Sequence, residues 1–333
     1  MKSENFVEAS SYIRVIEKKL LSSDSIRRIS EASTAAEALK QISGNSGYDF
    51  SSLNKTSDYE KVLKQELKET YQLLYKISPQ KEVVDILADK YVFHNIKVTL
   101  KAKYIQKDSD HLYLPIAGPG VLPLKKYILD NEKDDVLPEF IIQAIDDAEK
   151  VYEESKDPQD IDIILDKHMY QDMLMLCKEV HNDLITEHTK MSVDFHNIKA
   201  FVRVKSMDKG TRFLGKCLVS GGLTNTEYFL SHYDKSPDVI SSVFYYKYFG
   251  DVIKKGMESY NRTGNYSDLE KLFDDTLIEL TKKSKYLAFG PEVLFTYLLS
   301  KENEIRQVRI LITCKNNGIQ AETLKERLRD NYV

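Results

Sequence analysis

The residues that most invite a chemical interpretation are two histidines with identical neighbours. The pentapeptide Phe-His-Asn-Ile-Lys occurs at 93–97 and again at 195–199, so His94 and His196 have the same local sequence. Neutral imidazole is a common metal ligand, but a metal site needs three or four donors at suitable spacings. No HExxH motif and no Cys/His cluster accompanies either histidine. The pattern therefore predicts packed, hydrogen-bonded histidines and no metal site.

Nucleophilic and phosphate-binding chemistry finds no better support. The GxSxG motif is absent, and AGPGVLPLKK at 117–126 lacks the spacing and the Lys-Ser/Thr ending of a P-loop. No CxxC spacing joins the three cysteines, which are Cys177, Cys217 and Cys314. We therefore expect no catalytic residue, no cofactor and a reducing compartment. One enzyme alternative stays open, a hydrolase using His168 or His181 with carboxylates that converge in a deep pocket.

Basic residues at helical spacing offer a different kind of function. Lys97 and Lys101 are four residues apart, as are Lys199 and Arg203, so each pair falls on one face of a helix. Any single pair is typical of a solvated helix face. Because the spacing recurs in the two copies of the motif, it favours a shared surface that binds an acidic partner or a neighbouring domain.

The elements that would carry these residues are predicted to be helices. Long stretches rich in Leu, Lys, Glu, Ile and Tyr are separated by short Gly- and Pro-containing segments. The residues after Phe-His-Asn-Ile-Lys alternate like a strand, yet no Gly or Pro interrupts 81–114, which favours a helix. Helix starts are predicted where an N-cap residue precedes proline, at Ser78-Pro79, Asp157-Pro158 and Ser236-Pro237.

The bulk composition limits the class of protein. The 333 residues include 48 basic and 52 acidic side chains, and the resulting formal net charge of −4 gives no reason to expect a nucleic-acid partner. The N-terminal residues read as an amphipathic helix and not as a signal peptide. No apolar run approaches the roughly 18 residues that a membrane-spanning helix needs. We therefore expect that any work at a membrane is peripheral.

The repeated pentapeptide belongs to a longer internal duplication. Asn95 and Asn197 are 102 positions apart, and the same offset aligns the acidic start of 58–65 with that of 160–167. A weaker third copy begins at Ser267-Asp268, and Gln307-Val308-Arg309 echoes Asn-Ile-Lys at an offset of 110. The predicted unit of roughly 100–110 residues exceeds a solenoid repeat. It divides the chain into three similar helical domains, residues 1–108, 109–210 and 211–333, with the N-terminal helix able to pack on the third.

The C-terminal stretch resembles a known family. Phe289-Gly290-Pro291-Glu292, which opens a helix in that family, is followed by Glu302-Asn303-Glu304-Ile305-Arg306 and, three residues on, Arg309. Together with the Asp-x-x-Asn-Ile-Lys element at 194–199, these residues are similar to the C subunit of V-type and archaeal-type rotary ATPases. That protein is the counterpart of the d subunit of the eukaryotic V-ATPase.

The resemblance implies an all-α protein whose three similar helical domains form a pseudo-threefold funnel or socket. It also implies a non-catalytic central-stalk subunit, one copy per complex, on the cytoplasmic face of the membrane. Its partners would be the shaft subunits of the D and F type and the proteolipid rotor ring, so that ATP turnover is coupled to proton or sodium transport. The alternative from another class is a generic helical scaffold that binds some other acidic partner.

Protein–protein contacts, to the shaft or between domains, are expected at polar and charged positions of these motifs. The candidates are Asn95, Lys97, Lys101, Asn197, Lys199, Arg203, Glu302, Glu304, Arg306 and Arg309.

Overall fold

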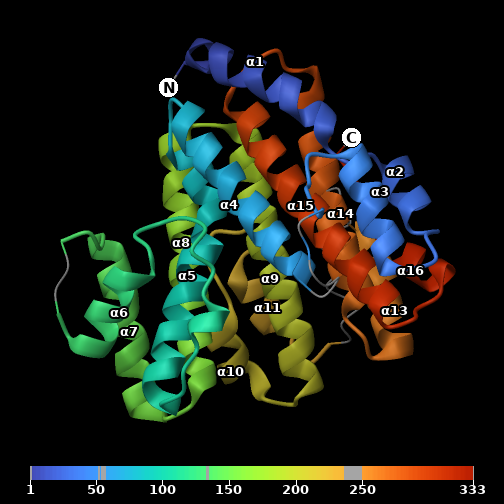
Figure 1. Ribbon diagram of the computed structural model, residues 1–333. Helices are drawn as coiled ribbons and strands as arrows, with labels where there is room; N and C mark the ends of the chain where they lie inside the picture. Colours follow the sequence, from blue (N-terminus) through green and yellow to red (C-terminus); the bar gives the residue numbers. More distant parts are fainter. Residues whose placement is uncertain (1, 52, 54–57, 133–134, 236–249, 333) are drawn as a thin grey trace.

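The computed structural model describes residues 2–51, 53, 58–132, 135–235 and 250–332 (Figure 1). These residues form helices and connecting turns and contain no β-strand, which confirms the predicted all-α class. Within the described part of the chain, no helix is both long and apolar enough to cross a membrane.

The helices fall into two length classes. The long ones are α4 (Tyr59–Ile77), α5 (Glu82–Ile105), α7 (Glu139–Ser155), α8 (Pro158–Val180), α9 (Asp183–Ser206), α13 (Gly250–Thr263), α14 (Ser267–Thr281) and α15 (Pro291–Asn316). The shorter ones are α1 (Val7–Ile16), α2 (Ser23–Ile29), α3 (Ala35–Asn45), α6 (Val121–Asp130), α10 (Gly210–Cys217), α11 (Thr226–Ser231) and α16 (Ala321–Arg327). Single 3₁₀ turns are η1 (Ser3–Phe6), η2 (Glu17–Lys19), η4 (Asp110–Leu112) and η5 (Lys282–Tyr286).

Local sequence explains several helix starts. The Asp157 carboxylate accepts a hydrogen bond from the Gln159 amide while Pro158 begins α8, as predicted from the Asp-Pro pair. Gly290 has a φ of 149°, a value open to glycine, and Pro291 then begins α15.

The other two predicted starts have different outcomes. Ser78 and Pro79 lie in the turn between α4 and α5, and α5 begins only at Glu82. The Ser78 hydroxyl donates to the Gln80 carbonyl and also lies 3.3 Å from the Gln80 amide, so it stabilises the turn instead of capping a helix. Ser236-Pro237 lies outside the described residues.

Both copies of the repeated pentapeptide are helical, in the middle of α5 and of α9. Their strand-like alternation is misleading because α5, α9 and α15 are covered by other helices on several sides. Buried side chains therefore occur almost all round each of these helices, and the simple 3.6-residue period is lost.

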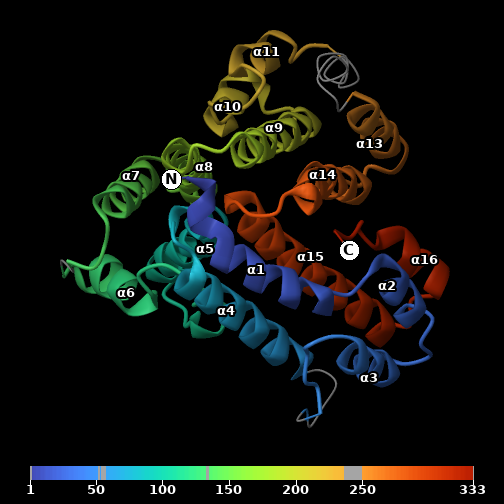
Figure 2. The same cartoon turned by 90° about the horizontal axis from the view of Figure 1, so that it is seen from above.

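Within the described part of the chain, three hydrophobic cores hold the helices together. One joins α1–α4, the start of α5 and the end of α8 to α15 and α16. A second joins the later half of α5 to α6, α7 and the start of α8. A third joins α9, α10 and α11 to α13 and α14. Seen from above, α5, α8, α9, α14 and α15 surround the centre, α6, α7, α10, α11, α13 and α16 lie outside them, and α1 crosses the middle of the view (Figure 2).

Hydrogen bonds join the inter-helix turns at one end of the molecule. Gln80, in the α4–α5 turn, donates from its amide to the Glu179 carbonyl at the end of α8. Asn182, in the α8–α9 turn, donates to the carboxylate of Glu292 at the start of α15. We call this the turn end; α1 also lies there, at the top of Figure 1.

Candidate functional site

In each copy of the repeat, a buried side chain in the middle of a long helix holds the backbone of a distant loop. The Asn95 amide donates to the Leu114 carbonyl (2.9 Å) and its oxygen accepts from the Leu114 amide (2.8 Å). Asn197 makes the same pair of bonds to Val219, both at 2.8 Å. Because both asparagines are buried, they satisfy backbone groups that water cannot reach. The duplicated Asn therefore has a structural role in both copies.

The third copy uses a carboxylate for the same purpose. Glu304 of α15 accepts a hydrogen bond from the Leu21 amide, and Asn331 donates to the Leu21 carbonyl. This loop precedes α2, so these bonds attach the N-terminal part of the chain to α15 and to the residues after α16. The sequence comparison placed Gln307 opposite Asn197, whereas these hydrogen bonds favour Glu304, three residues earlier. Side-chain similarity suggested Gln, but an amide oxygen and a carboxylate oxygen are equivalent as acceptors here.

We expect that Asn197→Ala will lower the free energy of unfolding by about 2–4 kcal/mol, because it orphans two buried backbone groups. Urea unfolding followed by circular dichroism measures this change. Asn317→Ala, at the exposed end of α15, is the control and should cost less than about 1 kcal/mol. Equal midpoints for the two variants would contradict the structural role of Asn197.

Ion pairs join each of these long helices to the start of another. Lys101 of α5 pairs with Asp162 of α8 at 2.7 Å, and Lys199 of α9 lies 3.8 Å from Glu270 of α14. Arg309 of α15 pairs with Glu60 of α4 at 2.6 Å. The three acidic residues occupy one repeat position, two residues after Asp58, Asp160 and Asp268. The chain thus carries a cyclic set of contacts, from α5 to α8, from α9 to α14 and from α15 to α4.

The remaining basic candidates divide between paired and exposed side chains. Lys97 pairs with Asp166 of α8 at 2.5 Å, and Arg306 pairs with Asp274 of α14 at 2.6 Å. Arg203 is exposed to solvent near the end of α9. Contacts within the chain therefore engage most of the basic candidates, which supports the domain-pairing alternative, while Arg203 points to solvent.

The acidic candidates Glu302 and Glu304 are buried in the middle of α15. Glu302 accepts hydrogen bonds from the hydroxyls of Tyr71 and Tyr91 and pairs with Lys90. Glu304 accepts from Tyr48 (2.8 Å) and pairs with Lys301 (2.9 Å). Each carboxylate lies among donors supplied by other helices and loops, so both residues stabilise the junction of the helices.

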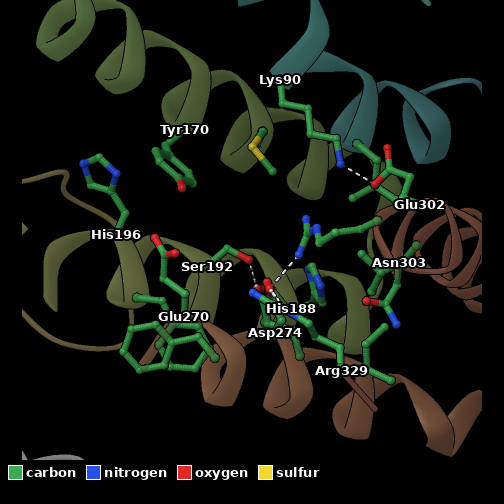
Figure 3. Close-up of a pocket in the computed structure, with 18 of the residues that line it drawn as sticks. Lys90, Tyr170, His188, Ser192, His196, Glu270, Asp274, Glu302, Asn303 and Arg329 are labelled. Carbon is green, nitrogen blue, oxygen red and sulfur yellow. Dashed lines mark hydrogen bonds and ion pairs between the residues drawn. The ribbon is translucent and has the colours of Figure 1, made fainter. Parts of the chain in front are cut away.

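A cavity of about 490 Å³ lies between α5, α8, α9, α14 and α15 (Figure 3). Its charged groups pair with one another. Lys90 pairs with Glu302, and Asp274 accepts from both Arg306 (2.6 Å) and Arg329 (3.2 Å). Sequence reasoning missed Lys90 and Arg329, which belong to no repeated motif, and Asp274, which lies in the third copy of the repeat but was not singled out. The cavity presents polar side chains without a strong net charge.

Within the described residues, His188 is a buried polar residue of the cavity whose side chain has no hydrogen-bond partner. Both ring nitrogens of His188 are buried and unpaired within the described residues, and its ring packs edge-on against Phe295 at 5.0 Å. Burial, with a smaller effect from Lys90, lowers the pKa of His188 to about 3. The imidazole therefore stays neutral at physiological pH and can both donate and accept.

The histidines considered as metal ligands or catalytic groups do not come together in one site. His94 lies 3.0 Å from the Leu112 carbonyl, His196 lies 3.4 Å from the Cys217 carbonyl, and His168 pairs with Asp147. His181 caps the end of α8 in a left-handed conformation. Among the described residues, no group of three or more His, Cys, Asp or Glu side chains is arranged to hold a metal ion.

Two aspartates form a buried pair that the sequence did not indicate. Asp89 of α5 and Asp172 of α8 share a hydrogen bond, and each side chain is almost inaccessible to solvent. Burial and the neighbouring carboxylate raise the pKa of Asp89 to about 10, and burial raises that of Asp172 to about 6. The pair therefore holds one proton at neutral pH, in the contact between α5 and α8.

Comparison with known proteins gives these contacts a family context. The model of the ATP synthase (C/AC39) subunit family matches residues 9–327. The C subunit of the V-type sodium ATPase of Enterococcus hirae is 28% identical, over 83% of this chain and 83% of its own length. The C subunit of the A-type ATP synthase of Methanocaldococcus jannaschii is 23% identical, over 95% of this chain and 84% of its own length. The C subunit of the A-type ATP synthase of Thermococcus kodakarensis is also 23% identical, over 94% of this chain and 87% of its own length. The resemblance noted in the sequence is thereby confirmed, and the chain belongs to the ATP synthase (C/AC39) subunit family.

Proposed function

We propose that this chain is the central-stalk component that couples the rotor shaft of a V- or A-type ATPase to its membrane rotor ring. It has no active site of its own in this proposal and acts as a passive mechanical adaptor. The observation that carries the proposal is the central cavity, which lies where three repeat-related long helices meet in a chain of this family. Torque transfer needs such a rigid, load-bearing seat and no chemical site.

The three repeats form a pseudo-threefold funnel in this proposal, with domains at residues 1–108, 109–210 and 211–333. Two regularities support it. A buried acceptor on α5, α9 and α15 binds a loop backbone, and an acidic residue at one repeat position receives an ion pair from the preceding repeat. A closed ring of such contacts resists twisting because each repeat is cross-linked to the next.

The proposal assigns the two ends of the molecule to different partners. Hydrogen bonds tie the turns together at the turn end, whereas cavity residues such as Lys199 and Arg306 lie three or more helical turns further along α9 and α15. The shaft subunits of the D and F type enter the cavity from the end opposite the turns. The proteolipid ring lies at the turn end, with one copy of the chain per complex on the cytoplasmic face.

The proposed shaft contact depends on shape and hydrogen bonds more than on net charge. The cavity cations are already paired with cavity carboxylates, so a charged tip would gain little electrostatic attraction. The residues of the ring, and not this chain, select the transported ion, which is a proton or sodium. Whether the complex synthesises ATP or pumps ions is likewise a property of the whole complex and not of this chain.

Filling the cavity tests this assignment. We expect Ser192→Trp, at a half-buried cavity position on α9, to reduce capture of the shaft subunits at least tenfold, because the indole occupies their seat. Pull-down of the co-expressed shaft subunits by the full chain measures the effect. Ser231→Trp, on the exposed face of α11, is the matched control and should capture them normally. Normal capture by a folded Ser192→Trp variant would remove the cavity as the shaft seat.

A further inference from the structure

An apolar and basic surface lies at the turn end, where α1 meets the segment 282–289. The Arg14 guanidinium donates to the carbonyls of Ser284 and Leu287, both at 2.7 Å, and the Ser10 hydroxyl accepts from the Gly290 amide. These bonds hold the two segments side by side in the outermost layer at the top of Figure 1. α1 and the segment 282–289 therefore form one continuous surface.

Large apolar side chains project from both segments. Tyr286 is 91% exposed and Val15 is 66% exposed, and Val7, Leu287 and Phe289 are also open to solvent. Exposed apolar side chains scattered singly need no explanation, but a group on adjoining segments indicates an interaction site. Burial of these side chains against a partner would be favourable.

Basic side chains lie at one end of this group. Lys18 and Lys19 follow α1, and Lys283 and Lys285 precede the exposed Tyr286; all four are exposed, although Lys285 also lies over the Tyr332 ring. Glu4 and Glu8 are exposed at the opposite, N-terminal end of α1. The excess of positive charge is local, because the whole chain has a formal net charge of −4. We name these apolar and lysine residues together the α1–η5 surface.

We propose that the α1–η5 surface binds the anionic phospholipid headgroups of the membrane beside the rotor ring. Lysines near an anionic bilayer each gain electrostatic attraction, while tyrosine and aliphatic side chains favour the headgroup boundary. An outer helix with projecting side chains fits a planar lipid surface. This inference rests on the proposed function only for the presence of a membrane at the turn end, and it adds a lipid contact to the protein contacts proposed there.

Vesicle co-sedimentation of the full chain tests the proposal. We expect it to sediment with phosphatidylcholine vesicles that contain phosphatidylglycerol and not with phosphatidylcholine alone, and added salt should weaken the binding. The variant Lys18→Glu/Lys283→Glu should bind at least about tenfold more weakly, since each lysine contributes on the order of 1 kcal/mol. Val15→Ser/Tyr286→Ser should also bind more weakly without changing the net charge.

A matched charge reversal elsewhere is the control. Lys254→Glu/Lys255→Glu changes the net charge equally at exposed positions of α13 and should leave vesicle binding at the wild-type level. Equal binding by the control and the Lys18/Lys283 variant, or no binding by the wild type, would overturn the proposal. If the wild type does not bind vesicles, and the Lys18/Lys283 variant no longer co-purifies with the ATPase, the surface contacts a protein and not lipid. Failure of the wild type to co-purify would instead contradict the proposed function.

Discussion

Replacing Glu304 with alanine is expected to lower the free energy of unfolding by roughly 3–5 kcal/mol, the cost of breaking a buried ion pair. Glu304 is 2% exposed and accepts hydrogen bonds from the Leu21 amide and the Tyr48 hydroxyl, besides pairing with Lys301. Its loss leaves these donors without a partner in the core. Chemical denaturation followed by circular dichroism gives the magnitude.

The position of Lys301 explains why the effect should be large. Burial lowers the pKa of Lys301, but the carboxylates of Glu304 and Glu66 outweigh burial and hold this pKa above its ordinary value. Lys301 therefore remains charged in the core and depends on both partners. Lys301→Met in the Glu304→Ala background should recover part of the stability, since it removes a buried charge that has lost one of its two partners and keeps only Glu66.

Limited proteolysis is a second measurement of the role of Glu304. The bond from Glu304 to Leu21 joins the N-terminal loop to α15, so Glu304→Ala should increase protease cleavage near Leu20–Ser22 before the rest of the chain is cut. Glu322→Ala, at an exposed position of α16, is the control and should change stability by less than about 0.5 kcal/mol. A loss below about 1 kcal/mol in Glu304→Ala would show that the carboxylate does not hold the third repeat together.

The second large effect is a dependence of stability on pH that Asp89 and Asp172 produce. Both pKa values are raised in the folded chain, so the folded state holds protons that the unfolded state has released. The contribution of this pair to stability must then fall as pH rises above the unfolded pKa of about 4. Between pH 6 and pH 8 the pair retains one extra proton, which corresponds to a loss of about 1.4 kcal/mol per pH unit.

Asp89→Asn should remove the part of this dependence that lies between pH 6 and pH 8. The asparagine amide donates to Asp172 at every pH, so no proton has to be held in the contact between α5 and α8. We expect the variant to be more stable than the wild type at pH 8 and similar to it near pH 5. Thermal melts at several pH values measure the difference.

Other ionisable groups near the Asp89–Asp172 pair could also change stability with pH, so the measurement needs a control. Asp85, whose pKa burial also raises, accepts a hydrogen bond from Tyr75, and Glu179 lies about two turns beyond Asp172 on the same face of α8. Asp130→Asn, at an exposed position ending α6, is the control and should keep the wild-type pH profile. Buried His188 has the opposite effect on stability only below about pH 6.5, so a wild-type profile that is flat from pH 7 to pH 8 would contradict the shared proton.

Local sequence was sufficient for several features of this protein. Leu-, Glu- and Lys-rich stretches between Gly and Pro predict helices, and capping side chains such as Asp157 define helix starts because their interactions lie within one turn. The duplication of Asn95 at Asn197 was visible as an identical pentapeptide. Family membership could be inferred from the residues around Gly290 and Glu304, since a motif keeps its spacing along the chain.

Only the tertiary structure showed what the repeated residues contact. Asn95 and Asn197 bind loops about 20 residues away, and Glu304 binds Leu21 at the other end of the chain, so no local pattern could reveal these contacts. The Asp89–Asp172 pair likewise forms between helices distant in sequence. Whether a charged side chain faces solvent or a partner depends on which helices meet, and the packing of all the helices together decides that.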